Sequence, residues 1–159
     1  MGKIAFQDSS FVISFHENVL VAITEGDGTL EAVDAWGKQI ELGGRAYPSG
    51  LALLFIIGDS AVVPSGPVRA LATEMFKTMQ GTVRVMSTAI EGSGFATATK
   101  RAAYTLISQG TIRRIPTKVH GDIDTACSWL EAEAKKAVIP SPSAKDLAAF
   151  TKGLPRPSA

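Results

Sequence analysis

Two neighbouring segments near the start of the chain, residues 11–16 and 19–24, carry a large apolar side chain at every second position. This spacing is typical of β-strands, because successive side chains of a strand point to opposite faces of the sheet. Only Glu17-Asn18 separates the two segments, so they are predicted to form a β-hairpin. The polar stretch that follows, residues 25–28, ends the second strand.

Later segments space their apolar residues three or four apart, which indicates helices. The four predicted helices run from the N-cap Thr29 to Gly43-Gly44, from the N-cap Ser65 to Gly81, from about Phe95 to Gln109, and onward from the N-cap Asp122. The apolar face of the third helix is expected to consist of Phe95, Ala98, Ala102 and Leu106.

The run Leu51–Ile57 contains no polar residue. A strand that is apolar on both faces is typical of the middle of a sheet covered by helices. Val83–Ile90 is predicted to be a further strand, and Thr117–Val119 a short edge strand. These elements predict an α/β fold with a mixed four- to five-stranded sheet, opened by the hairpin, and about four helices.

The character of the sequence changes at Val138, where Pro/Ser segments begin that cannot continue a helix. Residues 1–137 are therefore predicted to be one α/β domain, and residues 138–159 a flexible, Pro/Ser-rich C-terminal tail. Within the tail, Ala144 to Thr151 have the composition of two helical turns, with Leu147 and Phe150 on one side.

The chain of 159 residues has 16 basic and 15 acidic residues and a net charge of +1. This balance argues against nucleic-acid binding, which requires a concentrated positive field. The run Leu51–Ile57 is too short to span a membrane. The single Cys127 cannot form an intrachain disulfide, which fits a cytoplasmic protein. No cofactor is expected.

Two passages of the sequence, Asn18–Ile23 and Lys118–Leu130, resemble the STAS domain in its SpoIIAA-like branch. Together with the order of the predicted elements, the resemblance covers roughly residues 10 to 137. It implies a STAS/SpoIIAA-like fold and a non-catalytic regulatory or protein-interaction module. The partner that it implies is an anti-sigma-type kinase, or a second copy of the chain in a homodimer.

STAS proteins that antagonise anti-sigma factors carry an Asp-Ser-Ser-Gly stretch where the central strand meets its helix, and the partner kinase phosphorylates the serine. Here residues 58–66 form that junction, which is longer than the family's. Its candidate residues for a phosphorylation switch or a ligand-binding turn are Asp59, Ser60, Ser65 and Gly66. The alternative for Ser65 is that its side chain only caps the helix.

A second turn between a strand and a helix contains Gly92, Ser93 and Gly94. Exposed backbone N–H groups in such a turn can bind an anion, although the lysine of a phosphate-binding P-loop is absent. The alternative is a tight turn without a ligand. The two turns give the second functional hypothesis, a binder of a small apolar or anionic ligand such as a lipid, nucleotide or phosphate.

No set of residues has the spacing of a catalytic or metal site. An enzyme would need a pocket that joins Asp59 with His16 or Glu91, and Asp59 could also pair with Arg69. Cys127 shares an apolar helix face and is expected to be inert. The two tryptophans lie off the apolar stripes and are expected at the rim of the core; they are Trp36 and Trp129.

Overall fold

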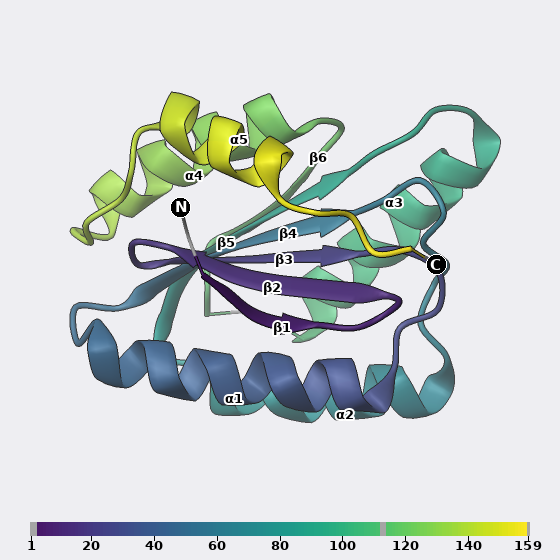
Figure 1. Cartoon of the computed structure of the whole chain (residues 1–159), viewed down its shortest axis with the longest axis horizontal. Helices are drawn as coiled ribbons and strands as arrows, with labels where there is room; N and C mark the ends of the chain where they lie inside the picture. Colours follow the sequence, from purple (N-terminus) through teal and green to yellow (C-terminus); the bar gives the residue numbers. More distant parts are fainter. Residues whose placement is uncertain (1–2, 112–113, 159) are drawn as a thin grey trace.

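The structure, a computed structural model, describes residues 3–111 and 114–158, which form one mixed sheet with helices on both faces (Figure 1). The strands lie side by side in chain order. They are β1 (Ile4–Gln7), β2 (Phe11–His16), β3 (Val19–Thr24), β4 (Leu51–Ile57), β5 (Val83–Ile90) and β6 (Thr117–His120). The helices are α1 (Leu30–Ala46), α2 (Gly66–Thr78), α3 (Phe95–Thr111), α4 (Ile123–Lys136) and α5 (Ala144–Gly153).

The first three strands pair antiparallel, and β3 to β6 pair parallel. Each parallel connection crosses over through one helix, and these three helices, α1 to α3, pack on one face of the sheet. Helices α4 and α5 cover the opposite face, as Figure 1 shows. The predicted α/β class, with a hairpin leading into a helix-covered mixed sheet, is confirmed.

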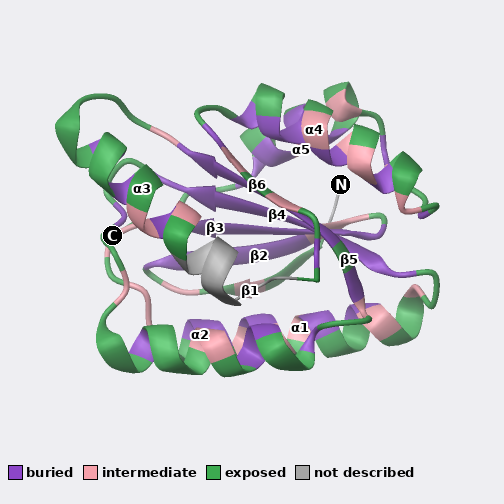
Figure 2. Cartoon of the chain, turned by 180° about the vertical axis from the view of Figure 1, so that it is seen from behind, coloured by how far each residue is buried: buried purple, intermediate pink, exposed green. Residues whose placement is uncertain are grey.

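Strand β4 is buried along its whole length, as its composition predicts (Figure 2). Leu51, Leu53 and Phe55 belong to the cluster under α1 to α3, whereas Leu54 and Ile56 belong to the cluster under α4 and α5. Alternate residues of the strand thus serve two separate cores, because the side-chain period of a strand is two. The residues that follow β4 are therefore anchored from both sides.

The sheet of the described residues has six strands because the sequence patterns miss β1. This strand pairs with β2 across an irregularity between Ile4 and Phe6. Most of its side chains are exposed, so it lacks the alternation of buried and exposed positions that identifies a strand.

The prediction that α1 ends at Gly43-Gly44 is wrong, since the helix continues to Ala46. Gly43 is buried, and a Cβ atom added to it would lie 2.9 Å from Leu51 Cδ1 and from the ring of Phe15. The glycine therefore permits close packing of the helix on the sheet instead of terminating the helix.

The prediction for the buried face of α3 is also wrong. Phe95 is 89% exposed and Leu106 is 69% exposed. The buried side chains of this helix include Thr97, Lys100 and Tyr104. These three positions also follow helical spacing. Thr97 and Lys100 donate hydrogen bonds to backbone carbonyls, and Tyr104 packs in the core, so a pattern of apolar residues does not reveal this face.

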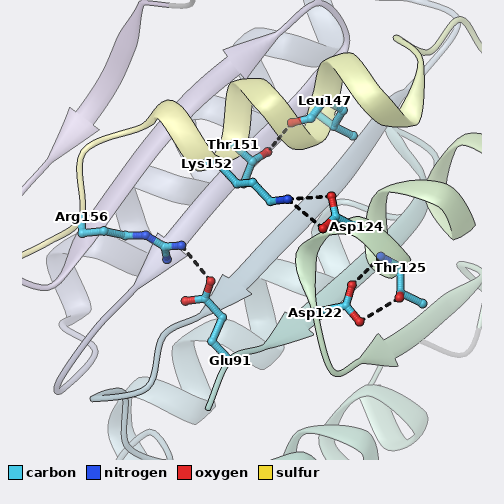
Figure 3. A network of polar contacts seen from close by, with 8 residues as sticks. All are labelled: Glu91, Asp122, Asp124, Thr125, Leu147, Thr151, Lys152 and Arg156. Carbon is cyan, nitrogen blue, oxygen red and sulfur yellow. Dashed lines mark hydrogen bonds and ion pairs between the residues drawn. The ribbon is translucent and has the colours of Figure 1, made fainter.

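The segment after Val138 differs from the flexible tail that its composition predicts. Helix α5 packs against α4, with Leu147 fully buried between them. Lys152 Nζ lies 2.7 Å from each carboxylate oxygen of Asp124, and Figure 3 marks both contacts. The apolar face of this short helix is sufficient to hold it in place because α4 offers a complementary surface. Composition alone cannot show such a surface.

Candidate functional site

The two turns identified in the sequence lie next to each other at one edge of the sheet. Ile57 and Ile90, the last residues of β4 and β5, are partners in the parallel pairing. The backbone N–H of Glu91 donates to the carbonyl of Ile57 at 2.9 Å. Open α/β sheets commonly place ligands at this carboxyl edge of parallel strands.

Ser60 is held by the turn between β3 and α1. Its hydroxyl donates to Glu25 Oε2 at 2.5 Å, and its backbone N–H donates to the same oxygen at 3.1 Å. The backbone N–H of Gly26 in turn donates to Ser60 Oγ at 3.2 Å. Gly58 has no Cβ, and a Cβ there would collide with the carboxylate of Glu25. The first part of the β4–α2 turn is therefore fixed to the neighbouring loop.

Ser65 occupies the N-cap position of α2, as predicted, but its side chain makes no capping hydrogen bond. Pro67, the second helical residue, has no N–H to donate, which leaves fewer amides for a cap. The side chain of Ser65 is exposed, and its carbonyl accepts from the N–H of Arg69 at 2.9 Å. A Cβ on the neighbouring Gly66 would meet nothing within 4 Å.

Lys100 on α3 is a site residue that the sequence analysis missed. Its Nζ donates to the carbonyl of Asp59 at 2.8 Å and to that of Gly58 at 3.4 Å, and its side chain is buried. The sequence does not distinguish Lys100 from its exposed neighbour Arg101, so it offered no signal for this role. The contacts of Lys100 fasten the β4–α2 turn to α3.

The turn with Gly92, Ser93 and Gly94 abuts Asp59. Gly92 has a φ of +102°, and a Cβ at this position would collide with Asp59 Oδ1. The Thr97 hydroxyl donates to the carbonyl of Ser93 at 3.1 Å. Glu91, at the start of the turn, pairs with Arg156 at 2.8 Å (Figure 3). The carboxylate of Asp59 beside the turn opposes the binding of an anion there, whereas Arg156 offsets the charge of Glu91.

Exposed apolar side chains surround these turns. Val62 is 47% exposed, Val63 is 36% exposed, and Phe95 is 89% exposed. We call residues 58–66 and 91–95 together the turn surface. It combines exposed apolar side chains with the hydroxyls of Ser60, Ser65 and Ser93 over an anchored backbone, an arrangement suited to contact with another molecule.

The structure separates His16 from Asp59, whereas it brings Glu91 and Asp59 to the same turn. His16 pairs with Val19, which lies beside Ala52 at the amino end of β4, whereas Asp59 follows the carboxyl end. The length of β4 separates the two ends by about 20 Å. The ring of His16 instead stacks on Phe150 of α5 at 4.5 Å.

The remaining titratable candidates, His120 and Cys127, are buried. His120 lies beside Trp129, with ring centroids 5.6 Å apart, and burial lowers its pKa from 6.5. Burial raises the pKa of Cys127 to about 12. This thiol is therefore protonated at neutral pH, which agrees with the inert role predicted for it.

A small cavity of about 80 Å³ opens between the sheet and helices α1 and α2. The aromatic side chains of Phe11, Trp36 and Phe55 line it, with ring centroids 4.9 to 6.0 Å apart. The predicted rim position of Trp36 is wrong, because this side chain is only 3% exposed. The rings of these three residues border the cavity without filling it.

In the described ranges, 3–111 and 114–158, no three His, Cys, Asp or Glu side chains come together as metal ligands would. Within the same ranges, none of the helices combines the length and the hydropathy needed to cross a lipid bilayer.

The protein is a mixed α/β domain whose element order is the one that the STAS resemblance implies, with β1 and α5 added. It is similar to a solved chain described as an anti-sigma factor antagonist from Mycobacterium paratuberculosis, with a TM-score of 0.47 and 13% sequence identity. The match covers 77% of this chain and 93% of that chain. No protein-family model matches the sequence, and no curated protein matches it.

Proposed function

We propose that the chain is a non-catalytic regulatory module that binds a protein partner through the turn surface. The observation that carries the proposal is Phe95, whose side chain is 89% exposed at the start of α3 beside the anchored β4–α2 turn. Large aromatic side chains are among the residues that contribute most to protein interfaces. Val62 and Val63 add exposed apolar side chains to the turn surface.

The anchoring of the turn surface supports a binding role. Lys100 holds the carbonyl oxygens of Gly58 and Asp59, and Glu25 holds Ser60. A surface fixed in advance loses less conformational entropy when a partner binds, so more of the contact energy appears as affinity.

The regulatory part of the proposal is phosphorylation, with Ser65 as the favoured site over Ser60. A phosphate on Ser65 would stand at the N-terminus of α2, where free backbone N–H groups and the helix dipole favour negative charge. Arg69 lies one helical turn further on. A phosphate on Ser60 would instead meet the carboxylate of Glu25, which Ser60 now contacts.

The proposed partner is an anti-sigma-type kinase, with a second copy of the chain as the alternative. The kinase would transfer the γ-phosphoryl group of ATP to Ser65 Oγ, so that the new O–P bond replaces the bond to ADP and the hydroxyl proton is released. The proposal entails a cytoplasmic location, since this partner uses ATP.

The proposal is tested by capture of partners from the native cell, using the whole chain as bait and mass spectrometry for detection. A matched pair of variants decides whether a captured protein binds the turn surface. Phe95→Glu places a charge on the turn surface. Leu42→Glu places the same charge outside it, at a 53% exposed position near the C-terminal end of α1. We expect Phe95→Glu to lower recovery of one protein at least about tenfold and Leu42→Glu to leave it unchanged.

Equal recovery with both variants would contradict the proposed surface. Recovery of no protein, together with a stoichiometric small molecule, would instead favour the ligand-binding alternative. For the switch, incubation with the captured kinase and ATP should phosphorylate the native chain and Ser60→Ala, but not Ser65→Ala.

A further inference from the structure

The cavity of about 80 Å³ described above is not explained by the proposed protein contact. It is roughly half the size of an engineered cavity of ~150 Å³ that binds benzene. Its walls are mainly apolar, and they include Val62 and Pro64 of the β4–α2 turn. An apolar space of this size excludes strongly hydrated molecules and accepts a short hydrocarbon group.

A residue that lines the cavity carries an unsatisfied hydrogen-bond donor. Trp36 is among the lining residues, and its indole Nε1 is buried without a hydrogen-bond acceptor among the described residues. Leaving such a donor unpaired costs free energy, which an oxygen acceptor that reached it would reduce.

The charge at the cavity is positive. Arg69 of α2 lines it and forms no ion pair with the described carboxylates, and the described lining residues include no acidic side chain. Among the lining residues, Thr29 contacts an acidic group, because its hydroxyl donates to Asp8 Oδ2 at 3.3 Å. A guanidinium group without a partner selects a carboxylate over a neutral or cationic group.

We propose that this cavity binds a small aliphatic monocarboxylate, with the hydrocarbon chain among the aromatic side chains and the carboxylate beside Arg69. The cavity would then be a ligand site that borders the turn surface, since Val62 and Pro64 belong to both. The inference does not depend on the proposed protein partner, because direct titration of the purified chain tests it.

Trp36 itself provides the measurement. The chain has two tryptophans, so Trp129→Phe leaves Trp36 as the only indole that reports on the cavity. Hexanoate, 1-hexanol and hexylamine are titrated into this variant while its fluorescence is recorded. We expect a saturable change with hexanoate, at a dissociation constant of about 1 mM or lower, and at least about tenfold weaker binding of the other two probes.

Two further substitutions in the Trp129→Phe background locate the ligand. Arg69→Gln should weaken hexanoate binding at least about tenfold, whereas Lys77→Gln, on the same helix but outside the cavity lining, should not. Ala72→Leu should abolish binding by filling the cavity, since Ala72 lines it. The absence of a saturable signal with hexanoate would overturn the inference. Equal affinity for 1-hexanol, or an unchanged affinity in Arg69→Gln, would do the same.

Discussion

Ser60 and Ser65 are five positions apart in one turn, yet their surroundings predict opposite responses to negative charge. Ser60→Asp would remove the hydrogen bond to Glu25 Oε2 and place two carboxylates together. We expect this variant to lose about 1 kcal/mol of unfolding free energy. Ser65→Asp adds charge at the N-terminus of α2, where the dipole should leave stability unchanged or raise it by about 0.5 kcal/mol.

Urea unfolding of the two aspartate variants and of the native chain measures both effects. Ser65→Ala is the matched control, and we expect it to be near neutral because the Ser65 side chain makes no capping hydrogen bond. A loss in Ser65→Asp as large as that in Ser60→Asp would contradict the geometry of the turn.

His120 predicts how stability depends on pH between 8 and 5. Burial lowers its pKa below 6.5, and Lys118 lowers it further, while Asp122 acts in the opposite direction. The unfolded chain therefore takes up the proton more readily than the folded chain. Stability should decrease as the pH falls from above 6.5 to the lowered pKa of the folded state, and this contribution should level off below it.

Denaturant unfolding at several pH values, for the native chain and for His120→Gln, checks this prediction. The decrease from pH 8 to 5 should be smaller in His120→Gln. The carboxylates with shifted pKa values, Asp122 and Glu131, have ordinary values of 3.8 and 4.5 and are lowered further, so they titrate below this window. The same decrease in both chains would show that His120 is not its source.

At the residue scale, the sequence predicts contacts between residues that are close together along the chain. Asp122 caps α4 through its carboxylate, which accepts from the N–H of Thr125 at 2.7 Å, and both residues lie within one helical turn. Lys100 was missed because its acceptors, Gly58 and Asp59, are 42 and 41 positions away. Only the packing of α3 beside the β4–α2 turn brings them together.

Two glycines of α1 lead to a prediction at the scale of the element. A Cβ on Gly37 would meet the flexible side chain of Met75 at 3.3 Å, whereas a Cβ on Gly43 would press on Leu51 and the Phe15 ring at 2.9 Å. We expect Gly37→Ala to change stability by less than about 1 kcal/mol or to raise it, since alanine favours helices. Gly43→Ala should cost about 1–3 kcal/mol through overpacking.

Thermal or urea unfolding of the two variants tests the comparison, with helix content by circular dichroism as the control for folding. If Gly43 served only to end the helix, Gly43→Ala would be no worse than Gly37→Ala. That result would restore the interpretation that the sequence first suggests.

The elements that sequence predicted well are those that bury a regular pattern. Strand β4 is apolar on both faces and buried on both, so its composition and its environment agree. In α3 the apolar residues Phe95 and Leu106 share a face that remains exposed, because Lys100 and Tyr104 occupy the sheet side. The spacing of apolar residues predicts the buried face of a helix only where those residues are buried, and in α3 they are exposed.

At the scale of the whole molecule, the sheet separates two hydrophobic clusters. One lies under α1 to α3 and contains Trp36; the other lies under α4 and α5 and contains Cys127. Both clusters use β3, β4 and β5, whose residues alternate between them. Neither cluster can lose its sheet face without exposing the other, so the two helical layers should unfold in one cooperative transition.

The two clusters carry independent probes of that transition. In Trp129→Phe, fluorescence reports on Trp36, and reaction with a thiol reagent reports on Cys127, whose pKa burial raises to about 12. Because the thiolate is the reactive form, labelling should be negligible until the α4–α5 layer opens. We expect the two probes to give the same urea midpoint. If Cys127 reacted at a lower urea concentration than that at which Trp36 fluorescence changes, α4 and α5 would detach separately, and residues 138–159 would then regain the independent character that their composition predicts.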